Sequence, residues 1–228
     1  MRLILLRQRT ISHLPCRLFP HPHQPNKSTM NPTDASLDEP LPMDIVLAST
    51  SPRRIELLTG LGYQFRIVAP GCEESVSGHF TPRELSLLNA KRKSHAVAVF
   101  EPTSIVIGAD TVVSIEGETL GKPNDMEEAQ SMLKKLNGRT HEVLTSVWIT
   151  RLHPFHMVAF TEVSGVTFHS MDQTAIREYL EKINPLDKAG AYAAQEYRDE
   201  IIQHIEGSLD NVIGLPVESV ALALSEFE

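Results

Sequence analysis

The stretch Ile45-Val46-Leu47-Ala48-Ser49-Thr50-Ser51-Pro52-Arg53-Arg54 indicates the fold class of this chain. Its four leading apolar residues predict a short buried strand. Ser51 suits the N-cap of a helix and Pro52 suits its first position, while the apolar residues that follow have helical spacing. This spacing predicts a helix that ends near Gly60 or Gly62. A buried strand that leads directly into a helix is typical of α/β proteins.

Arg53 and Arg54 fall in the first turn of that predicted helix. A helix N-terminus carries unpaired N–H groups and the positive end of the macrodipole, so cations are unfavourable there unless an anion is bound. Two guanidinium groups can bind a phosphate through bidentate hydrogen bonds. The pattern therefore predicts a ligand that carries phosphate. Two solvated arginines on a surface helix are the alternative that this segment alone leaves open.

The composition limits the class of function. The chain has 228 residues, of which 41% are hydrophobic, and this suits one sizeable globular domain. Its net charge is −8, whereas nucleic-acid-binding domains carry a basic face, so we expect no nucleic-acid partner. Cys16 and Cys72 give no disulfide framework, and no apolar run is long enough to span a membrane. We therefore expect a cytoplasmic protein without a membrane partner.

Residues 1–42 differ from the rest of the chain. They are rich in proline and have no acidic residue before Asp34. We expect this segment to be a disordered extension outside the catalytic domain, which we place at 43–228. An organellar transit peptide and an over-extended reading frame, with a start at Met30 or Met43, are the alternatives that stay open.

From residue 43 onward, strand and helix signals alternate along the chain. Apolar or alternating runs predict further strands at 64–69, 104–109, 143–150, 157–168 and 201–205. Caps and helical spacing predict further helices at 82–99, 125–136 and 172–182 and after Pro216. This alternation predicts an α/β fold, and the lack of repeats or linkers within 43–228 predicts one domain.

Acidic residues flank two of the predicted strands. Asp110 follows the strand at 104–109, and ligands bind at the carboxyl ends of strands in open α/β sheets. A turn cap is the alternative role for this residue. Glu73 and Glu74 follow a Pro-Gly turn, so we expect at least one of them to point into a cleft, with surface solvation as the alternative.

Cationic residues accompany these acids. Lys91 lies on the flank of the apolar face of its predicted helix, and either it or Arg92 could reach a phosphate. Lys122 lies between Gly121 and Pro123. We expect it to contact a ligand, and an ordinary lysine of a surface loop is the alternative. Carboxylates that suit a hard cation, together with cations that suit phosphate, indicate metal-assisted chemistry on a phosphate ester or anhydride. The chain contains no P-loop, Rossmann fingerprint or nucleophile elbow.

Five separated motifs occur in the order in which one known family carries them. They are Leu-Ala-Ser-Thr-Ser-Pro-Arg-Arg at 47–54, Gly-Ala-Asp-Thr at 108–111, Gly-Lys-Pro at 121–123, Asp-Lys-Ala-Gly-Ala-Tyr at 187–192 with Gln195, and Asn-Val-Ile-Gly-Leu-Pro at 211–216. Over residues 44–225 the chain thus resembles the Maf (septum-formation-inhibitor-like) nucleotide pyrophosphatases. The resemblance implies an α/β fold with a mixed sheet, flanking helices and a cleft between two lobes, like that of inosine-triphosphate pyrophosphatases. It also implies hydrolysis of nucleoside triphosphates to monophosphate and pyrophosphate.

The same resemblance implies roles for individual residues. It makes Asp110 the general base and places Glu74 and Asp110 at a divalent metal, Mg²⁺ with Mn²⁺ as the alternative. It assigns triphosphate and pocket contacts to Ser49, Arg53, Arg54, Glu74, Lys91 and Lys122. The partner that it implies is the nucleoside triphosphate substrate, and a homodimer stays open.

Base selection follows from three further matches. Arg53, Thr111 and Gln195 match positions linked to the base in the subgroup that acts on dTTP and UTP. The chain departs from that subgroup at 196–199 and at Leu209, which affects the rim of the base pocket. We therefore expect a dTTP and UTP pyrophosphatase. A non-catalytic nucleotide-binding regulator of cell division and a 7-methyl-GTP pyrophosphatase are the alternatives.

Overall fold

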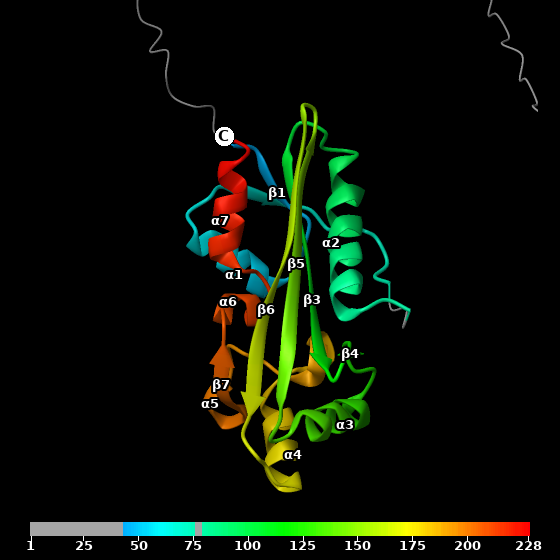
Figure 1. Cartoon of the computed structure of the whole chain (residues 1–228), viewed down its shortest axis with the longest axis vertical. Helices are drawn as coiled ribbons and strands as arrows, with labels where there is room; N and C mark the ends of the chain where they lie inside the picture. The colour runs from blue at the N-terminus through cyan, green and yellow to red at the C-terminus, as the bar shows by residue number, and fades with distance from the viewer. Residues whose placement is uncertain (1–42, 76–78) are drawn as a thin grey trace, which may run out of the picture. The chain divides into compact units, whose positions relative to one another are not determined.

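The computed structural model describes residues 43–75 and 79–228, and the segment 1–42, for which the sequence predicts disorder, lies outside the described residues. The described chain forms a sheet with helices packed on its faces (Figure 1). The strands are β1 (Ile45–Leu47), β2 (Phe65–Ile67), β3 (Ile105–Ile115), β4 (Glu118–Leu120), β5 (Thr140–Leu152), β6 (Phe155–Phe168) and β7 (Ile202–Glu206). The helices are α1 (Pro52–Gly60), α2 (Pro82–Ala98), α3 (Met126–Leu136), α4 (Gln173–Lys182), α5 (Arg198–Ile201), α6 (Leu209–Ile213) and α7 (Val217–Ser225), with 3₁₀ turns η1 (Pro185–Asp187) and η2 (Ala189–Ala191).

The sheet is mixed. Strand β1 lies between β2 and β3 and runs parallel to both. Strands β3, β5, β6 and β7 follow one another as antiparallel neighbours, and β4 pairs antiparallel with the end of β3. The order β2-β1-β3-β5-β6-β7 confirms the predicted α/β class with a mixed sheet and flanking helices.

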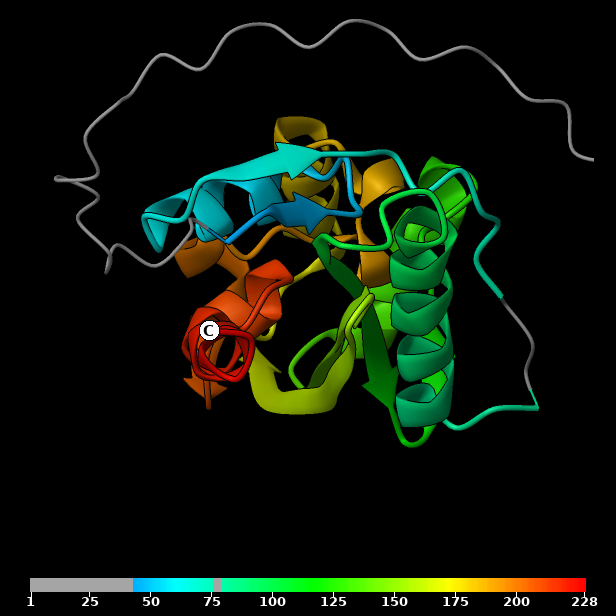
Figure 2. The same cartoon turned by 90° about the horizontal axis from the view of Figure 1, so that it is seen from above.

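Helices α2 and α7 cover opposite faces of the long strands (Figure 2). Alternate residues of β3 show this directly, because successive side chains of a strand point to opposite faces. Val106 packs in a cluster with Val97 of α2. Ile105 and Ile107 pack in a different cluster with Leu224 of α7. Helix α2 is thereby fixed against one face of β3.

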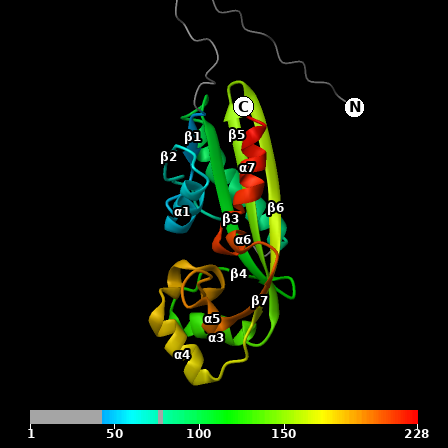
Figure 3. The ribbon, with the colours of Figure 1, turned by 90° about the vertical axis from the view of Figure 1, so that its left-hand side faces the viewer.

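Two large hydrophobic clusters divide the described domain into two lobes (Figure 3). One cluster joins β1, α1 and α7 to the first half of β3 and the facing part of β5. The other joins α3, α4 and η2 to the second half of β3. Strands β3, β5 and β6 run through both lobes, so the sheet joins them. This arrangement agrees with the expected pair of lobes.

Most predicted helix boundaries are confirmed. Helix α1 begins at Pro52 and ends at Gly60, although Ser51 makes no side-chain capping hydrogen bond. The Ser51 N–H instead donates to Ser49 Oγ at 3.2 Å. Helix α2 begins with the predicted capping box, in which Thr81 and Glu84 exchange side-chain and backbone hydrogen bonds.

The prediction that a strand ends just before Asp110 is wrong. Strand β3 continues to Ile115, because β5 pairs with it along its whole second half and Asp110 itself pairs with Ser146. The parallel neighbour β1 ends at Leu47, opposite Ile107. Asp110 therefore lies just beyond the carboxyl ends of the parallel strands, and the expected ligand-binding edge of the sheet is in the expected place.

Gly108 fixes the distance between α2 and β3. A Cβ atom at this position would lie 2.4 Å from the carbonyl oxygen of Ala90 and 2.5 Å from the backbone nitrogen of Ser94. The backbone of α2 can approach this closely only because residue 108 has no side chain. Two polar residues of α2, Asn89 and Lys93, are thereby held beside Asp110.

Candidate active site

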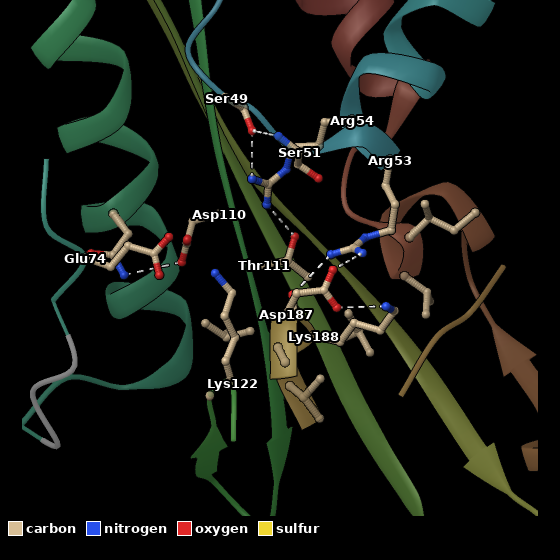
Figure 4. A pocket seen from close by; sticks show the side chains of 18 of the residues that line it. Ser49, Ser51, Arg53, Arg54, Glu74, Asp110, Thr111, Lys122, Asp187 and Lys188 are labelled. Atoms are coloured by element: carbon tan, nitrogen blue, oxygen red, sulfur yellow. Dashed lines mark hydrogen bonds and ion pairs between the residues drawn. The ribbon is translucent and has the colours of Figure 1, made fainter. Parts of the chain in front are cut away.

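A pocket of about 840 Å³ lies between the lobes. Its lining comes from the β1–α1 connection, α2, β3, the segment around Lys122 and the η1–η2 region (Figure 4). Most of the candidate residues line it: Ser49, Arg53, Arg54, Glu74, Asp110, Thr111, Lys122 and Gln195. Ligand pockets are typically about 300–1,000 Å³, so this one is large enough for a nucleotide.

A lysine bridges the two candidate carboxylates. Lys93 Nζ donates to Asp110 Oδ1 at 2.7 Å and lies 2.6 Å from Glu74 Oε1. Asp110 and Lys93 are 5% and 7% exposed, whereas the Glu74 side chain is half-exposed at the pocket wall. Because charged side chains are buried only with partners, the Asp110–Lys93–Glu74 cluster forms one electrostatic unit.

The two carboxylates of this cluster differ in acidity. Burial raises the pKa of Asp110 above its usual value, although Lys93 and Arg54 act in the opposite direction. Burial also acts to raise the pKa of Glu74, but Lys93, Lys122 and Arg54 together hold it below its usual value. Two carboxylates whose environments push their pKa values apart are suited to different roles, Asp110 to accepting a proton and Glu74 to staying ionised.

Arg54 is held in place by the protein. Its Nε donates to Gly214 O at 2.9 Å, its Nη2 to Thr111 Oγ1 at 3.0 Å and its Nη1 to Ser49 Oγ at 3.5 Å. A guanidinium has five N–H donors, and these bonds use three of them. Within the described part of the chain, two donors of a fixed guanidinium thus have no partner and remain for an anion in the pocket.

The hydroxyl of Thr111 belongs to a chain of hydrogen bonds whose direction is determined by its ends. Arg54 can only donate to Thr111, and the backbone carbonyl of Asn211 can only accept from Thr145, at 2.8 Å. The Thr111–Thr145 bond of 2.9 Å must then use the proton of Thr111, because Thr145 has already donated its own. The Thr111 hydroxyl therefore accepts a hydrogen bond from Arg54 and has no proton left to donate to the nucleobase of a substrate.

Arg53 contacts Asp187 of η1 on the opposite side of the pocket. Its Nη1 lies 3.5 Å from Asp187 Oδ2, and its Nη2 donates to Asp187 O at 3.4 Å. Lys188 Nζ donates to the other carboxylate oxygen of Asp187 at 2.8 Å. Burial acts to raise the pKa of Asp187, but Lys188 and Arg53 lower it below its usual value. Arg53 thus connects the N-terminus of α1 to the opposite lobe.

Lys122 and Gln195 lie where the resemblance implies. Figure 4 shows the Lys122 side chain pointing into the pocket on the Asp110 side. Gln195 lines the pocket from the segment after η2, and its Nε2 donates to Glu56 at 3.4 Å.

The placement of Lys91 in the pocket is wrong. Lys91 is exposed, and its ammonium lies 5.1 Å from the centre of the Trp148 ring. Lys93 takes the expected place, since residues two apart on a helix point roughly 200° apart. One signal in the sequence could have identified it: Ser86, Ala90, Lys93 and Val97 follow the spacing of one buried helix face.

Sequence reasoning also missed Asn89 and the role of Asp187. Asn89 Nδ2 donates to Asp110 Oδ2 at 3.4 Å from a position that sequence alone would assign to the surface or the core. Asp187 belongs to one of the five motifs, but its pairing with Arg53 spans 134 residues and depends on the assembled fold.

The carboxylates fit a divalent cation that completes its shell with substrate. Within the described residues, no group of three acidic, histidine or cysteine side chains converges on one point. Mg²⁺, however, is often bound by one or two carboxylates together with phosphate oxygens and waters. The carboxylates of Asp110 and Glu74 both contact the ammonium group of Lys93, so they lie close enough together to supply those two ligands.

Among the described residues, no helix is both long and apolar enough to cross a membrane.

Comparison with known proteins adds to this geometry. Residues 44–227 match a family model described as Maf-like protein. A protein of Akkermansia muciniphila named dTTP/UTP pyrophosphatase is 48% identical over 181 residues, which are 79% of this chain and 95% of the relative. A protein of Pelotomaculum thermopropionicum with the same name is 44% identical, over 81% of this chain and 96% of the relative. Among solved structures, the Staphylococcus aureus Ham1 protein is similar with a TM-score of 0.41 and 19% identity, over 55% of this chain and 71% of that chain.

Proposed function

This chain belongs to the Maf family, and from this premise we propose that it hydrolyses nucleoside triphosphates, dTTP and UTP in preference, to the monophosphate and pyrophosphate. One observation carries the proposal. A buried carboxylate with a raised pKa faces the same pocket as a fixed guanidinium with two uncommitted donors. The first feature suits the activation of water, and the second suits the binding of phosphate.

The residues divide the proposed work between them. The phosphates lie against the N-terminus of α1, Arg54 and Lys122, whose positive charge offsets the charge of the leaving pyrophosphate. Asp110 accepts the proton of a water whose oxygen attacks the α-phosphorus. The bond from that phosphorus to the α,β-bridging oxygen breaks, and pyrophosphate leaves with the electron pair. A regulator that only binds nucleotides would have no need for a buried carboxylate such as Asp110, paired with Lys93, in the phosphate-binding pocket.

A divalent cation, Mg²⁺ with Mn²⁺ as the alternative, is part of the proposal. Asp110 and Glu74 would hold it, and it would supply charge neutralisation to the phosphate oxygens. Support comes from the two carboxylates, which approach each other closely enough for both to contact the Lys93 ammonium. The substrate class also leads us to propose a cytoplasmic location, and a homodimer stays a prediction.

The proposed base selection depends on Gln195. Gln195 lines the pocket, and its side-chain amide would hydrogen-bond the edge of a pyrimidine. A site that hydrogen-bonds the correct base rejects one that leaves its polar groups unpaired, at about 1–3 kcal/mol for each group.

The test is a panel of nucleoside triphosphates with Mg²⁺, with pyrophosphate and orthophosphate release measured separately. We expect pyrophosphate from dTTP and UTP at rates well above those from ATP and GTP. We also expect Gln195→Ala to narrow that difference. Orthophosphate as the first product would contradict the proposed reaction, and 7-methyl-GTP as the best substrate would contradict only the base preference.

A further inference from the structure

Asn89 of α2 makes a pair of hydrogen bonds with the backbone of Ser75. Its Oδ1 accepts from the Ser75 N–H at 2.8 Å, and its Nδ2 donates to Ser75 O at 3.1 Å. The side chain is 3% exposed, so these bonds are shielded from water. A buried amide that pairs with both polar groups of one residue holds that residue in place as a neighbouring strand would.

The pairing also determines which way the amide faces. A backbone N–H can only donate, so the oxygen of the amide must be the atom that meets Ser75 N. The Nδ2 group therefore lies on the other side, where it also donates to Asp110 Oδ2 at 3.4 Å. The Asn89 side chain thus contacts both Asp110, the proposed general base, and Ser75, the residue next to Glu74.

Lys93 completes this arrangement one turn further along α2. It binds Asp110 Oδ1 and Glu74 Oε1, whereas Asn89 binds Asp110 Oδ2 and the Ser75 backbone. Each carboxylate-bearing segment is therefore held at two points by the same helix. Lys93 alone would leave the backbone that carries Glu74 free to move away from the pocket.

We propose that Asn89 is a positioning residue, which holds the segment bearing Glu74 and the carboxylate of Asp110 in one fixed arrangement for catalysis. This inference rests on the proposed pyrophosphatase function and assigns to Asn89 no contact with substrate. Because the phosphates are bound mainly by Arg54, Lys122 and the N-terminus of α1, loss of Asn89 should slow the chemical step and leave substrate binding nearly unchanged.

The chain contains a matched control. Asn137, at the end of α3, makes the same two-bond pair with the backbone of Met171, at 2.8 Å for each bond. It does not line the pocket. Asn137→Ala removes the same pair of backbone hydrogen bonds but no bond to Asp110, so it is the control for losing such a pair away from the pocket, and we expect it to leave catalysis unchanged.

The experiment compares wild type, Asn89→Ala, Asn89→Asp and Asn137→Ala. Steady-state dTTP hydrolysis gives kcat and KM, and hydrogen exchange followed by mass spectrometry reports the protection of the Ser75 amide. We expect Asn89→Ala to lower kcat about 10- to 100-fold with KM within about threefold of wild type. Its Ser75 amide should exchange faster, while Asn137→Ala keeps wild-type kcat and wild-type Ser75 protection.

Asn89→Asp keeps the bond from the Ser75 N–H and removes both bonds that Nδ2 donates, to Ser75 O and to Asp110 Oδ2. The new carboxylate can still accept from the Ser75 N–H, but it places an acceptor oxygen against both Ser75 O and Asp110 Oδ2 in place of a donor. We expect its kcat to fall at least as far as that of Asn89→Ala. Wild-type kcat in either Asn89 variant, or an equal loss in Asn137→Ala, would overturn the proposal. Wild-type protein that releases no pyrophosphate would instead contradict the proposed function, and unchanged Ser75 protection in Asn89→Ala would still contradict the positioning role.

Discussion

Charge balance in the pocket is established by a few residues that contact one another. Lys93 offsets Asp110 and Glu74 directly, and Arg54 and Lys122 lie close enough to lower the pKa of Glu74. A triphosphate brings further negative charge, so the cations in excess of the two carboxylates become useful only when substrate is present. The sequence predicted this mixture of charges. It did not predict that Lys93, and not Lys91, would be the lysine of α2 that lines the pocket.

Asp110→Asn tests the proposed base. The change keeps the shape of the side chain and removes its ability to accept a proton, so we expect kcat for dTTP to fall about 10²- to 10⁴-fold. Lys93 retains its pair with Glu74, and burial already raises the pKa of Asp110, so the variant should fold with a melting temperature close to that of wild type. Kinetics and a thermal melt measure both properties. Near-normal turnover in a folded variant would remove Asp110 from the mechanism.

Thr111→Val tests the direction of the hydrogen-bond chain. The change removes the acceptor of Arg54 Nη2, which is worth about 1–1.5 kcal/mol, so we expect KM to rise about tenfold. The rise should be equal for dTTP and ATP, and inhibition by inorganic tripolyphosphate, which has no base, should weaken by a similar factor. Thr111→Ser keeps the hydroxyl and serves as the control. A changed ratio of dTTP to ATP with unchanged tripolyphosphate inhibition would show that Thr111 reads the base instead.

At the scale of elements, helices were predicted more accurately than strands. Helices α1, α2 and α3 carry their own start signals in Pro52, in the capping box at Thr81 and in Asp125, and all three begin where predicted. Strand ends depend on the neighbouring strand. The sequence predicts a strand that ends just before Asp110, yet β5 pairs with β3 well beyond it, and this pairing is not encoded locally.

Gly108→Ala tests the contact between α2 and β3. The added Cβ would meet backbone atoms of Ala90 and Ser94 at 2.4 and 2.5 Å, and backbone cannot yield as a side chain can. We expect the free energy of unfolding to fall by about 2–3 kcal/mol or more, as for other overpacked sites, and kcat to fall as Lys93 moves relative to Asp110. Denaturant titration and kinetics measure the two effects.

Gly165→Ala, in strand β6, is the matched control. The nearest atom to an added Cβ there is 3.7 Å away, which is ordinary contact distance, so its stability should stay within about 0.5 kcal/mol of wild type. Equal effects of the two substitutions would mean that β-strand glycines in general, and not the approach of α2, limit stability.

At the scale of the whole molecule, the pocket exists because distant segments meet. Arg53 and Asp187 are 134 residues apart, and Arg54 and Gly214 are 160 residues apart. Local patterns identify such residues as polar positions at element ends, and a family resemblance brings them into one site. Neither gives the direction of a hydrogen bond, the pairing of Asn89 with Ser75, or the choice of Lys93, because these follow from packing that only the folded chain defines.

Stability of the whole domain should depend on pH through His141. This side chain is buried between Phe168 and Tyr192, its Nδ1 has no hydrogen-bond partner among the described residues, and burial lowers its pKa from 6.5 to about 4. Between these two values the unfolded chain binds a proton that the folded chain does not, so His141 makes the folded state progressively less stable as pH falls from about 6.5 to 4. The loss would reach about 3 kcal/mol at 1.36 kcal/mol for each pKa unit.

His141→Gln should remove most of that loss. The glutamine cannot be protonated, and its carbonyl can accept from the hydroxyl of Tyr192, which lies 3.0 Å from His141 Nε2. We expect the free energies of unfolding of variant and wild type to converge as pH falls toward 4, even if the variant is less stable at pH 7. Denaturant titrations at pH 4, 5, 6 and 7 measure this, with His204→Gln on the exposed part of β7 as the control that should run parallel to wild type. Parallel curves for His141→Gln would mean that other groups cause the loss of stability in acid.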